Sequence, residues 1–340
     1  MSIAYSGDNI TFPDASTQNT SPTGFGFKNR IINGAMVVSQ RGTSSTTITD
    51  VGATTYTVDR WLAYGSSASK FSVQQNAGSV TPAVGFSNYY GVTSLAATSV
   101  AAGDLYYMGQ FIEGFNFADM AWGTANAKTV ILSFQVYSSL TGTFGGALTN
   151  SGNTRSYPFS YSIPIANTWT SISVTIAGDT TGTWVGATNG TGLKIFFGLG
   201  MGSNFSGTAG AWAGADYRTS TSAVSVVGTS GATFYITGID LRKGSTGAYS
   251  NGQNDFDYRP YGTELALCQR YYELGGGVTA TALGTGGIYT QFPFKVTKRA
   301  AATITNTRSV TAGGDLINYW YQSSNDSAST PFSFTSSAEL

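Results

Sequence analysis

Apolar and polar residues alternate along several segments between residues 29 and 250. β-Branched and aromatic residues recur at every second position in these runs, and Gly, Ser, Asn and Thr separate them. The clearest runs are 128–137, 168–176, 193–199 and 232–241. A two-residue period predicts strands with one buried face. We therefore expect an all-β fold built on an antiparallel sandwich, and the period alone allows either a jelly roll or an immunoglobulin-like sandwich.

One segment follows a helical period instead. Residues 263–274 place Leu265, Cys268 and Tyr272 on one helical face, and the glycines from Gly275 onward stop the helix. The polar residues expected to point outward or to cap neighbouring elements are Glu264, Gln269, Arg270 and Glu273. Cys268, the single cysteine, is expected inside the helix as a small hydrophobic residue.

Composition and turn residues divide the chain into four parts. Residues 1–28 form a polar, turn-rich arm whose short extended piece cannot bury its own apolar side chains and needs neighbours; a frayed terminus is the alternative. Residues 29–250 form the sandwich, and residues 251–275 a linker with the short helix. Residues 276–340 return to strand-like alternation and are expected to form a C-terminal β region.

Charge and residue usage exclude several classes of function. Charged residues make up 10% of the chain, and 17 basic residues balance 17 acidic ones, so no net field attracts nucleic acid or an anionic membrane. The chain has no histidine, which excludes Ser-His-Asp and Cys-His catalysis and histidine-based metal sites. We expect no metal and no cofactor. No apolar run is long enough to span a membrane and no signal peptide is visible, so we expect synthesis in a cytoplasm.

Three motifs combine arginine with aromatic or branched apolar residues. They lie at residues 29–42, 59–61 and 256–272. Guanidinium groups in such surroundings bond carboxylates while lying over rings, so we expect Asp59 to pair with Arg41 or Arg259 and a guanidinium to lie across Trp61. The residues assigned to this structural motif are Asn29, Arg30, Asn33, Gly34, Gln40, Arg41, Asp59, Arg60, Trp61, Arg259, Glu264, Cys268, Arg270 and Tyr271.

In their order and in their residues, these motifs resemble those of phage virion proteins found in tail fibres and other surface fibres. The resemblance covers most of the chain, from about residue 10. It implies a jelly-roll body similar to a carbohydrate-binding module, and a homotrimer whose arm at residues 1–28 serves attachment and trimerisation. It further implies a tail fibre, located in the virion, that docks on baseplate or tail proteins and binds a host surface polysaccharide. The alternatives are a capsid decoration or head-fibre protein that stabilises the shell and, less favoured, a glycan-degrading tailspike.

A glycosidase needs only two suitably placed carboxylates. The candidate pairs are Glu113 with Asp119, and Asp255 with Asp257, and neither pair lies in a recognisable signature. Glu113 is more simply interpreted as a strand residue whose side chain holds a neighbouring strand. Asp255 and Asp257 are more simply interpreted as part of a solvated turn or as a brace for Arg259. We therefore expect binding without catalysis.

Aromatic rings in loop-like contexts are the candidate ligand contacts. Rings stack on the CH faces of sugars while amides and hydroxyls recognise the hydroxyl groups, and this chemistry requires neither charge nor histidine. The candidates are Tyr89, Tyr90, Trp122, Trp212 and Tyr217. Burial in a subunit interface is the alternative for each of them. Trp61, Trp169 and Tyr235 lie in strand-like segments and are expected in the core.

Overall fold

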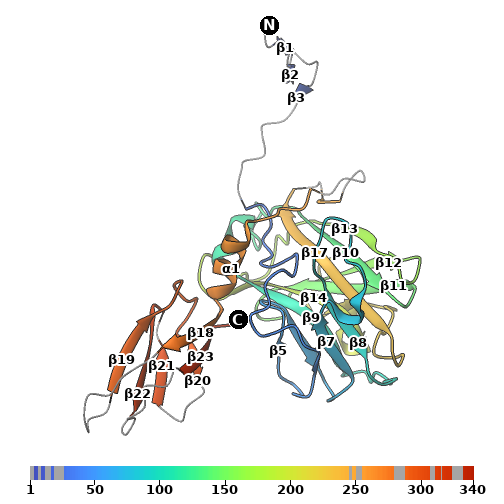
Figure 1. The fold of residues 1–340 in the computed structure, drawn as a ribbon. Helices are drawn as coiled ribbons and strands as arrows, with labels where there is room; N and C mark the ends of the chain where they lie inside the picture. The colour runs from blue at the N-terminus through green and yellow to red at the C-terminus, as the bar shows by residue number, and fades with distance from the viewer. Residues whose placement is uncertain are drawn as a thin grey trace.

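The protein folds mainly as a sandwich of two six-stranded antiparallel sheets (Figure 1). The computed structural model describes residues 27–244, 247–249, 255–278, 288–306, 311–314, 316–323 and 332–340, together with three short strands before residue 27. Sheet I has the strand order β13-β10-β17-β8-β7-β4, and sheet II has the order β12-β11-β14-β9-β6-β5.

The strands of sheet I are β4 (Thr46–Thr47), β7 (Phe71–Gln75), β8 (Tyr90–Ser94), β10 (Val130–Ser138), β13 (Thr170–Ile176) and β17 (Thr233–Lys243). The strands of sheet II are β5 (Thr55–Tyr56), β6 (Leu62–Gly65), β9 (Leu105–Glu113), β11 (Gly142–Thr149), β12 (Ser156–Ile163) and β14 (Thr191–Met201). Short 3₁₀ turns connect some of them: η1 (Ala77–Ser79), η2 (Gly114–Asn116), η3 (Ala118–Met120) and η4 (Ser203–Phe205).

The chain passes repeatedly from one sheet to the other. Strands β8, β10, β13 and β17 belong to sheet I, whereas β9, β11 and β14, which lie between them in sequence, belong to sheet II. Strands therefore pair with partners distant in sequence, as β9 does with β6 and β14. This alternation between two packed sheets is a jelly-roll arrangement, and it decides against the immunoglobulin-like alternative.

The predicted alternation is confirmed in the strands of the core. In β10, the side chains of Val130, Leu132, Phe134 and Val136 are inaccessible to solvent and pack between the sheets. The other three predicted runs correspond to β13, β14 and β17. Their every-second apolar side chains supply a further part of the core, because successive side chains of a strand point to opposite faces.

Strand β17 keeps its apolar side chains inward by means of a bulge. Its register with β10 shifts near Gly238, whose φ is 60°. Ile236 before the bulge and Ile239 after it both face the core. A side chain at position 238 would collide with the hydroxyl of Tyr249, so the position requires glycine on two grounds.

Helix α1 spans Tyr261–Gln269 and is shorter than the predicted helix. Tyr272 does not continue the helical face, because it starts strand β18 (Tyr272–Val278), which pairs with β23 (Phe332–Ser337). Cys268 is buried as predicted, and burial raises the pKa of its thiol. The expectation of outward side chains is wrong for Glu264 and Gln269, which are 7% and 6% exposed. It is also wrong for Glu273, because its carboxylate pairs with a buried lysine.

Two three-stranded sheets follow the helix, with the orders β18-β23-β20 and β19-β22-β21. Their other strands are β19 (Ile288–Pro293), β20 (Thr303–Asn306), β21 (Thr311–Gly314) and β22 (Asn318–Ser323). They lie beside α1 and extend away from the sandwich (Figure 1). This C-terminal β region starts at Tyr272 rather than at residue 276, because the strand replaces the last turn of the predicted helix.

The predicted arm contains β1 (Ala4–Ser6), β2 (Asn9–Thr11) and β3 (Thr17–Gln18), which pair in an antiparallel sheet. Apart from these strands and residues 27 and 28, the arm lies outside the described residues. No helix in the described part of the chain is both long and apolar enough to cross a membrane.

Candidate functional site

The arginine motifs meet where the sandwich, α1 and the C-terminal strands come together. The guanidinium of Arg60 lies 3.6 Å from the ring centroid of Tyr271, and that of Arg41 lies 3.5 Å from the centroid of Tyr272. Both guanidinium groups pair with the carboxylate of Glu339. We call the group formed by Arg41, Asp59, Arg60, Tyr271, Tyr272 and Glu339 the arginine junction. It joins residues that are 279 positions apart in sequence.

The predicted pairing of Asp59 with Arg41 is confirmed at 3.7 Å. The prediction for Trp61 is wrong, because the rings beneath the guanidinium groups are tyrosines from the third motif. Arg60 has a left-handed φ of 71°, and its side chain turns toward the junction. Trp61 is inaccessible between the sheets and donates its indole N–H to the carbonyl of Asn33 at 3.0 Å.

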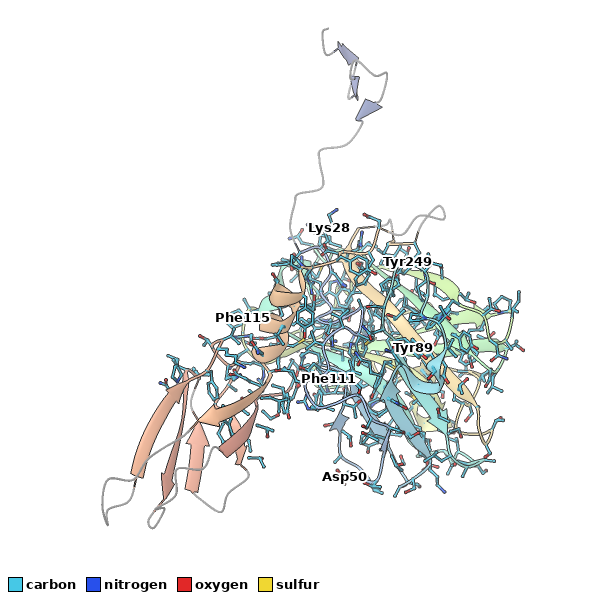
Figure 2. The ribbon with its side chains drawn as sticks, in the orientation of Figure 1. Lys28, Asp50, Tyr89, Phe111, Phe115 and Tyr249 are labelled. Carbon is cyan, nitrogen blue, oxygen red and sulfur yellow. The ribbon has the colours of Figure 1, made fainter. Side chains whose placement is uncertain are left out.

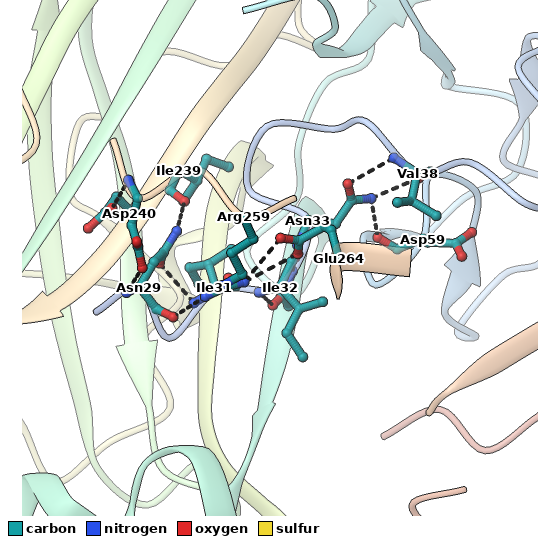
Figure 3. A network of polar contacts seen from close by, with 12 residues as sticks. Asn29, Ile31, Ile32, Asn33, Val38, Asp59, Ile239, Asp240, Arg259 and Glu264 are labelled. Carbon is teal, nitrogen blue, oxygen red and sulfur yellow. Dashed lines mark hydrogen bonds and ion pairs between the residues drawn. The ribbon is translucent and has the colours of Figure 1, made fainter. Parts of the chain in front are cut away.

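Asn33 and Glu264 tie the first motif to the third (Figure 3). The Asn33 amide donates to the carbonyls of Val38 at 2.8 Å and Asp59 at 2.9 Å. The Glu264 carboxylate accepts the backbone N–H of Asn33 and lies 3.2 Å from Nη1 of Arg259. The buried carboxylate is therefore fully occupied by structural partners, as buried charges must be.

Asn29 and Gly34 attach the same segment to β17. The Asn29 amide donates to the carbonyl of Ile239 at 2.9 Å (Figure 3). Gly34 lies so close to that carbonyl that a Cβ atom would collide with it. Gln40 extends the connection to the C-terminal region, because its amide donates to the carbonyl of Tyr272 at 2.9 Å. These motif residues hold the architecture together.

The first pair of candidate catalytic carboxylates is also engaged in structure. Glu113 is 1% exposed, accepts from Arg270 at 2.6 and 2.9 Å, and accepts the hydroxyl of Tyr271 at 2.6 Å. The hydrogen bonds that Arg270 donates to Glu113 raise the pKa of Arg270. Asp119 pairs with Arg30 at 2.7 Å. A catalytic carboxylate must be free to exchange a proton with the substrate or to attack it, whereas these two carboxylates are engaged by arginine side chains.

The second candidate pair is divided between two structural contacts. Asp255 pairs with Arg242 at 3.0 Å. Asp257 accepts the backbone N–H groups of Lys28 at 2.7 Å and Asn29 at 3.0 Å, rather than bracing Arg259. Among the described residues, no group of three or more acidic or cysteine side chains is placed to hold a metal ion.

Three of the five predicted ligand-contacting aromatics are buried, which contradicts their placement on the surface. Tyr89 and Tyr90 are inaccessible to solvent, and Trp122 is 6% exposed. The Tyr90 hydroxyl lies 2.8 Å from Oγ1 of Thr57, and burial raises its pKa. The loop ends at Tyr89, because Tyr90 is the first residue of β8.

Trp122 and Trp212 belong to a cluster of tryptophans. Trp122, Trp184 and Trp212 pack edge to face with ring centroids 4.9 to 5.5 Å apart. Each indole N–H donates to a nearby backbone carbonyl, so the cluster fixes the surrounding loops. Trp212 and Tyr217 are half-buried, and their role as ligand contacts stays a prediction.

The outer surface of sheet II carries a row of rings that the sequence reading did not single out. Tyr64 of β6 lies flat on Tyr107 of β9, with centroids 5.0 Å apart and ring planes at 7°. Phe196 of β14 meets Tyr107 edge to face at 4.9 Å. Phe111 continues the row toward α1 (Figure 2). Tyr64 and Phe111 are half-buried, and burial raises the pKa of Tyr107 to about 12.

Two cations are fixed over these rings. Arg218 makes a two-pronged ion pair with Asp216, 2.9 Å at each contact, and its guanidinium lies 5.3 Å from the ring centroid of Phe196. Lys194 donates to the carbonyl of Ser151 at 2.8 Å and lies 5.3 Å from the ring of Phe111. Burial and the charge of Arg218 lower the pKa of Lys194. We call the surface formed by Tyr64, Tyr107, Phe111, Lys194, Phe196, Phe205, Asp216 and Arg218 the aromatic face.

A pocket of about 390 Å³ adjoins the aromatic face. It lies where β14 ends beneath the chain segment that contains β15 (Ser206–Gly207) and β16 (Thr219–Ser220). Met201 contributes to the pocket and also packs against the buried rings of the face. The aromatic face, with its rings and two cations, and the pocket therefore lie next to each other on the outer side of sheet II.

The outer surface of sheet I carries a second group of rings. Tyr137 stacks on Tyr235 with centroids 5.4 Å apart and planes at 8°, and Trp169 and Tyr89 complete the group. The core prediction is therefore wrong for Trp169, which is half-buried on this outer surface. Tyr235 is buried, but beneath this cluster and not between the sheets. The residues from η1 onward cover part of the cluster, because the carbonyl of Thr81 accepts the Trp169 indole N–H at 2.8 Å.

No protein-family model and no curated protein sequence matches this chain. Among solved structures, the enzymatically active domain of tailspike protein 4 from bacteriophage CBA120 aligns with 64% of the chain at 13% identity and a TM-score of 0.30, and the alignment spans 22% of the tailspike chain. A family 11 carbohydrate-binding module from Clostridium thermocellum, solved with a β-1,3-1,4-linked tetrasaccharide, aligns with 59% of the chain and 96% of the module at 11% identity and a TM-score of 0.28. At these TM-scores, the jelly-roll assignment depends on the strand order of the chain itself.

Proposed function

We propose that this protein binds a glycan on the aromatic face. The observation that carries the proposal is the flat stack of Tyr64 on Tyr107 beside the ion-paired Arg218. A half-buried ring can offer exposed ring surface to the CH groups of a sugar, and the parallel ring of Tyr107 on the neighbouring strand holds it in a fixed orientation. An ordered guanidinium adds donors in a fixed geometry for sugar hydroxyls.

The contacts around Arg218 suit the role of a sugar-binding donor. Asp216 forms an ion pair with the guanidinium, and the ring centroids of Phe196 and Phe205 lie 5.3 and 5.5 Å from it. A side chain ordered before binding loses little conformational entropy when a ligand arrives. Only part of the donor capacity of Arg218 is used by Asp216, because a guanidinium carries five N–H groups.

Titration calorimetry with purified surface polysaccharides of candidate bacterial hosts, with mixed-linkage β-glucan and dextran alongside, tests the proposal. Tyr64→Ala is expected to weaken binding about tenfold, because it removes the stacking surface. Tyr137→Ala is the matched control, since Tyr137 is also a half-buried tyrosine stacked on another tyrosine, but on sheet I. Loss of binding in Tyr137→Ala alone would move the site to sheet I, and absence of binding by the wild type would refute glycan binding.

We further infer that the protein is a receptor-binding fibre of a phage virion, a homotrimer made in the host cytoplasm that attaches through its arm to tail or baseplate proteins. The motifs at residues 29–42, 59–61 and 256–272 support this inference through their resemblance to phage fibre proteins. Electron microscopy of virions labelled with antibody against residues 29–250 tests it. Label on tail appendages supports the fibre, whereas label spread over the capsid supports the decoration protein.

We propose that binding occurs without hydrolysis. The support is the engagement of Glu113, Asp119, Asp255 and Asp257 with structural partners. Incubating the bound polysaccharide with the protein and measuring new reducing ends tests this. An increase in reducing ends would show a glycan-degrading tailspike instead.

A further inference from the structure

The pocket beside the aromatic face contains two buried hydroxyl groups that lack partners. Thr219 and Ser220 of β16 are each 3% exposed, and neither Thr219 Oγ1 nor Ser220 Oγ has a hydrogen-bond partner. A buried polar group without a partner costs about 1–3 kcal/mol. The fold nevertheless places two such groups side by side at the wall of a hollow.

Glycines of the sheet beneath make room for these hydroxyls. A Cβ atom on Gly198 of β14 would lie 2.8 Å from Thr219 Oγ1, and one on Gly145 of β11 would collide with both hydroxyl oxygens. Gly198 also lines the pocket. The two glycines therefore leave sheet II without side chains at the point where the two hydroxyls face it.

The chemistry of the lining defines the class of ligand. Within the described part of the chain, the lining carries hydroxyl, glycine and small apolar groups and no charged side chain, with Ser203, Ser206 and Thr221 adding further hydroxyls and Met201 and Val224 apolar surface. Anions such as phosphates or uronic acids would find no cation here. Hydroxyl groups and apolar patches together match the two sides of a neutral sugar ring, and a volume of about 390 Å³ lies within the range of ligand pockets.

The pocket and the aromatic face share one segment of chain. Arg218, whose guanidinium lies over the rings of the face, directly precedes Thr219, which lines the pocket. We propose that the pocket holds one uncharged pyranose unit of the glycan whose neighbouring units lie on the aromatic face. This assignment rests on the proposed function, since it makes the pocket the part of that site that selects the sugar.

The test uses saturation-transfer NMR with galactose, glucose, mannose and N-acetylglucosamine as neutral probes and glucuronic acid as the charged one. At least one neutral sugar is expected to give a signal with the wild type, whereas glucuronic acid gives none. The double substitution Thr219→Val with Ser220→Ala is expected to weaken that signal about tenfold, because it removes two hydrogen-bonding groups. Its melting temperature should be unchanged or higher, since the hydroxyls are unpaired in the free protein.

A second variant keeps the proposal testable if the double substitution fails to fold. Thr221→Trp places a bulky ring on an exposed residue of the pocket wall without altering either buried hydroxyl. It too should abolish the neutral-sugar signal, whereas Tyr64→Ala should keep it.

The outcomes separate the two proposals. If polysaccharide binding depends on Tyr64 but neither pocket variant changes affinity or sugar preference, the pocket assignment is wrong and glycan binding stands. A glucuronic acid signal equal to that of the neutral sugars would also overturn the assignment. If the wild type binds no polysaccharide yet a neutral-sugar signal is lost in both pocket variants, the pocket is a sugar site of its own, and both the aromatic face and its link to the pocket are wrong.

Discussion

The arginine junction and the aromatic face both combine an arginine, a carboxylate and aromatic rings. They differ in how much of the ion pair is exposed to solvent. In the junction, the side chains of Arg60 and Glu339 are 1% and 8% exposed. On the aromatic face, those of Arg218 and Asp216 are 14% and 29% exposed, beside the half-buried ring of Tyr64. A buried ion pair must find all its partners inside the protein, whereas a partly open one keeps donors and ring surface for a ligand. The Arg60–Glu339 pair is therefore closed to a ligand and the Arg218–Asp216 pair is open to one. Arg41 is as exposed as Arg218, at 15%, and differs from it in pairing with two carboxylates of the junction, Asp59 and Glu339.

The largest effect is expected from Arg60→Ala. It leaves the buried Glu339 carboxylate with Arg41 as its remaining cation, opens a space beside Glu339, and removes the cation from the Tyr271 ring. Breaking a buried pair from one side costs about 3–5 kcal/mol, so the free energy of unfolding measured with urea should fall by that amount. A variant with unchanged unfolding that merely loses glycan binding would contradict the architectural role.

A double variant provides the control for this change. Arg60→Met with Glu339→Gln removes both charges and keeps similar volume. It should recover part of the lost stability, because no unpaired charge remains buried. Equal destabilisation in the single and double variants would show that Arg60 stabilises the fold mainly by packing on Tyr271 and not through the ion pair.

An intermediate effect on stability and a larger one on binding are expected from Arg218→Ala. The ion pair with Asp216 is partly exposed, and such pairs contribute about 0–1 kcal/mol to stability. Polysaccharide affinity should fall about tenfold, because an ordered donor group is lost. Arg218→Lys should recover little of it, since lysine keeps the charge but not the planar fork. Unchanged affinity in both variants would remove Arg218 from the site.

The smallest effect is expected from Arg30→Ala. Arg30 belongs to the first motif, but its pair with Asp119 is exposed, at 25% and 52% for the two side chains. The free energy of unfolding, measured by thermal denaturation, should therefore fall by less than about 1 kcal/mol, and the affinity for polysaccharide should not change. A loss comparable to that of Arg60→Ala would show that motif membership, and not burial, decides the role of these arginines.

Local sequence patterns predict the strands of the core, but they do not predict which side chains form the surfaces. Alternation identified β10, β13, β14 and β17, because each strand carries its own period-two signal. The same local logic failed at the end of α1, where pairing of Tyr272 with β23 decides the backbone conformation. It also failed for Tyr89, whose ring packs on Tyr235 from a distant strand.

The aromatic face depends on pairing between strands that are far apart in sequence. Tyr64 meets Tyr107 because β6 pairs with β9 in the register that sets these two residues opposite each other. Nothing in either strand alone indicates this partner. Leu105, Tyr107 and Phe111 give β9 a second apolar side, but a strand with apolar residues on both sides is also typical of a fully buried one. The charge pairing of Arg41 with Asp59 was predictable because the motifs supplied few other partners.

The separation of Arg60 from Glu339 has a consequence for how the chain is made. During synthesis, the strands of the sandwich emerge well before Glu339, which follows Arg60 by 279 residues. Until Glu339 is made, the Arg60 guanidinium of a completed sandwich lacks the carboxylate with which it pairs. Contacts between such distant residues also form slowly, because a long loop must close first. We therefore expect the Arg60–Glu339 pair to be among the last contacts that the newly made chain forms.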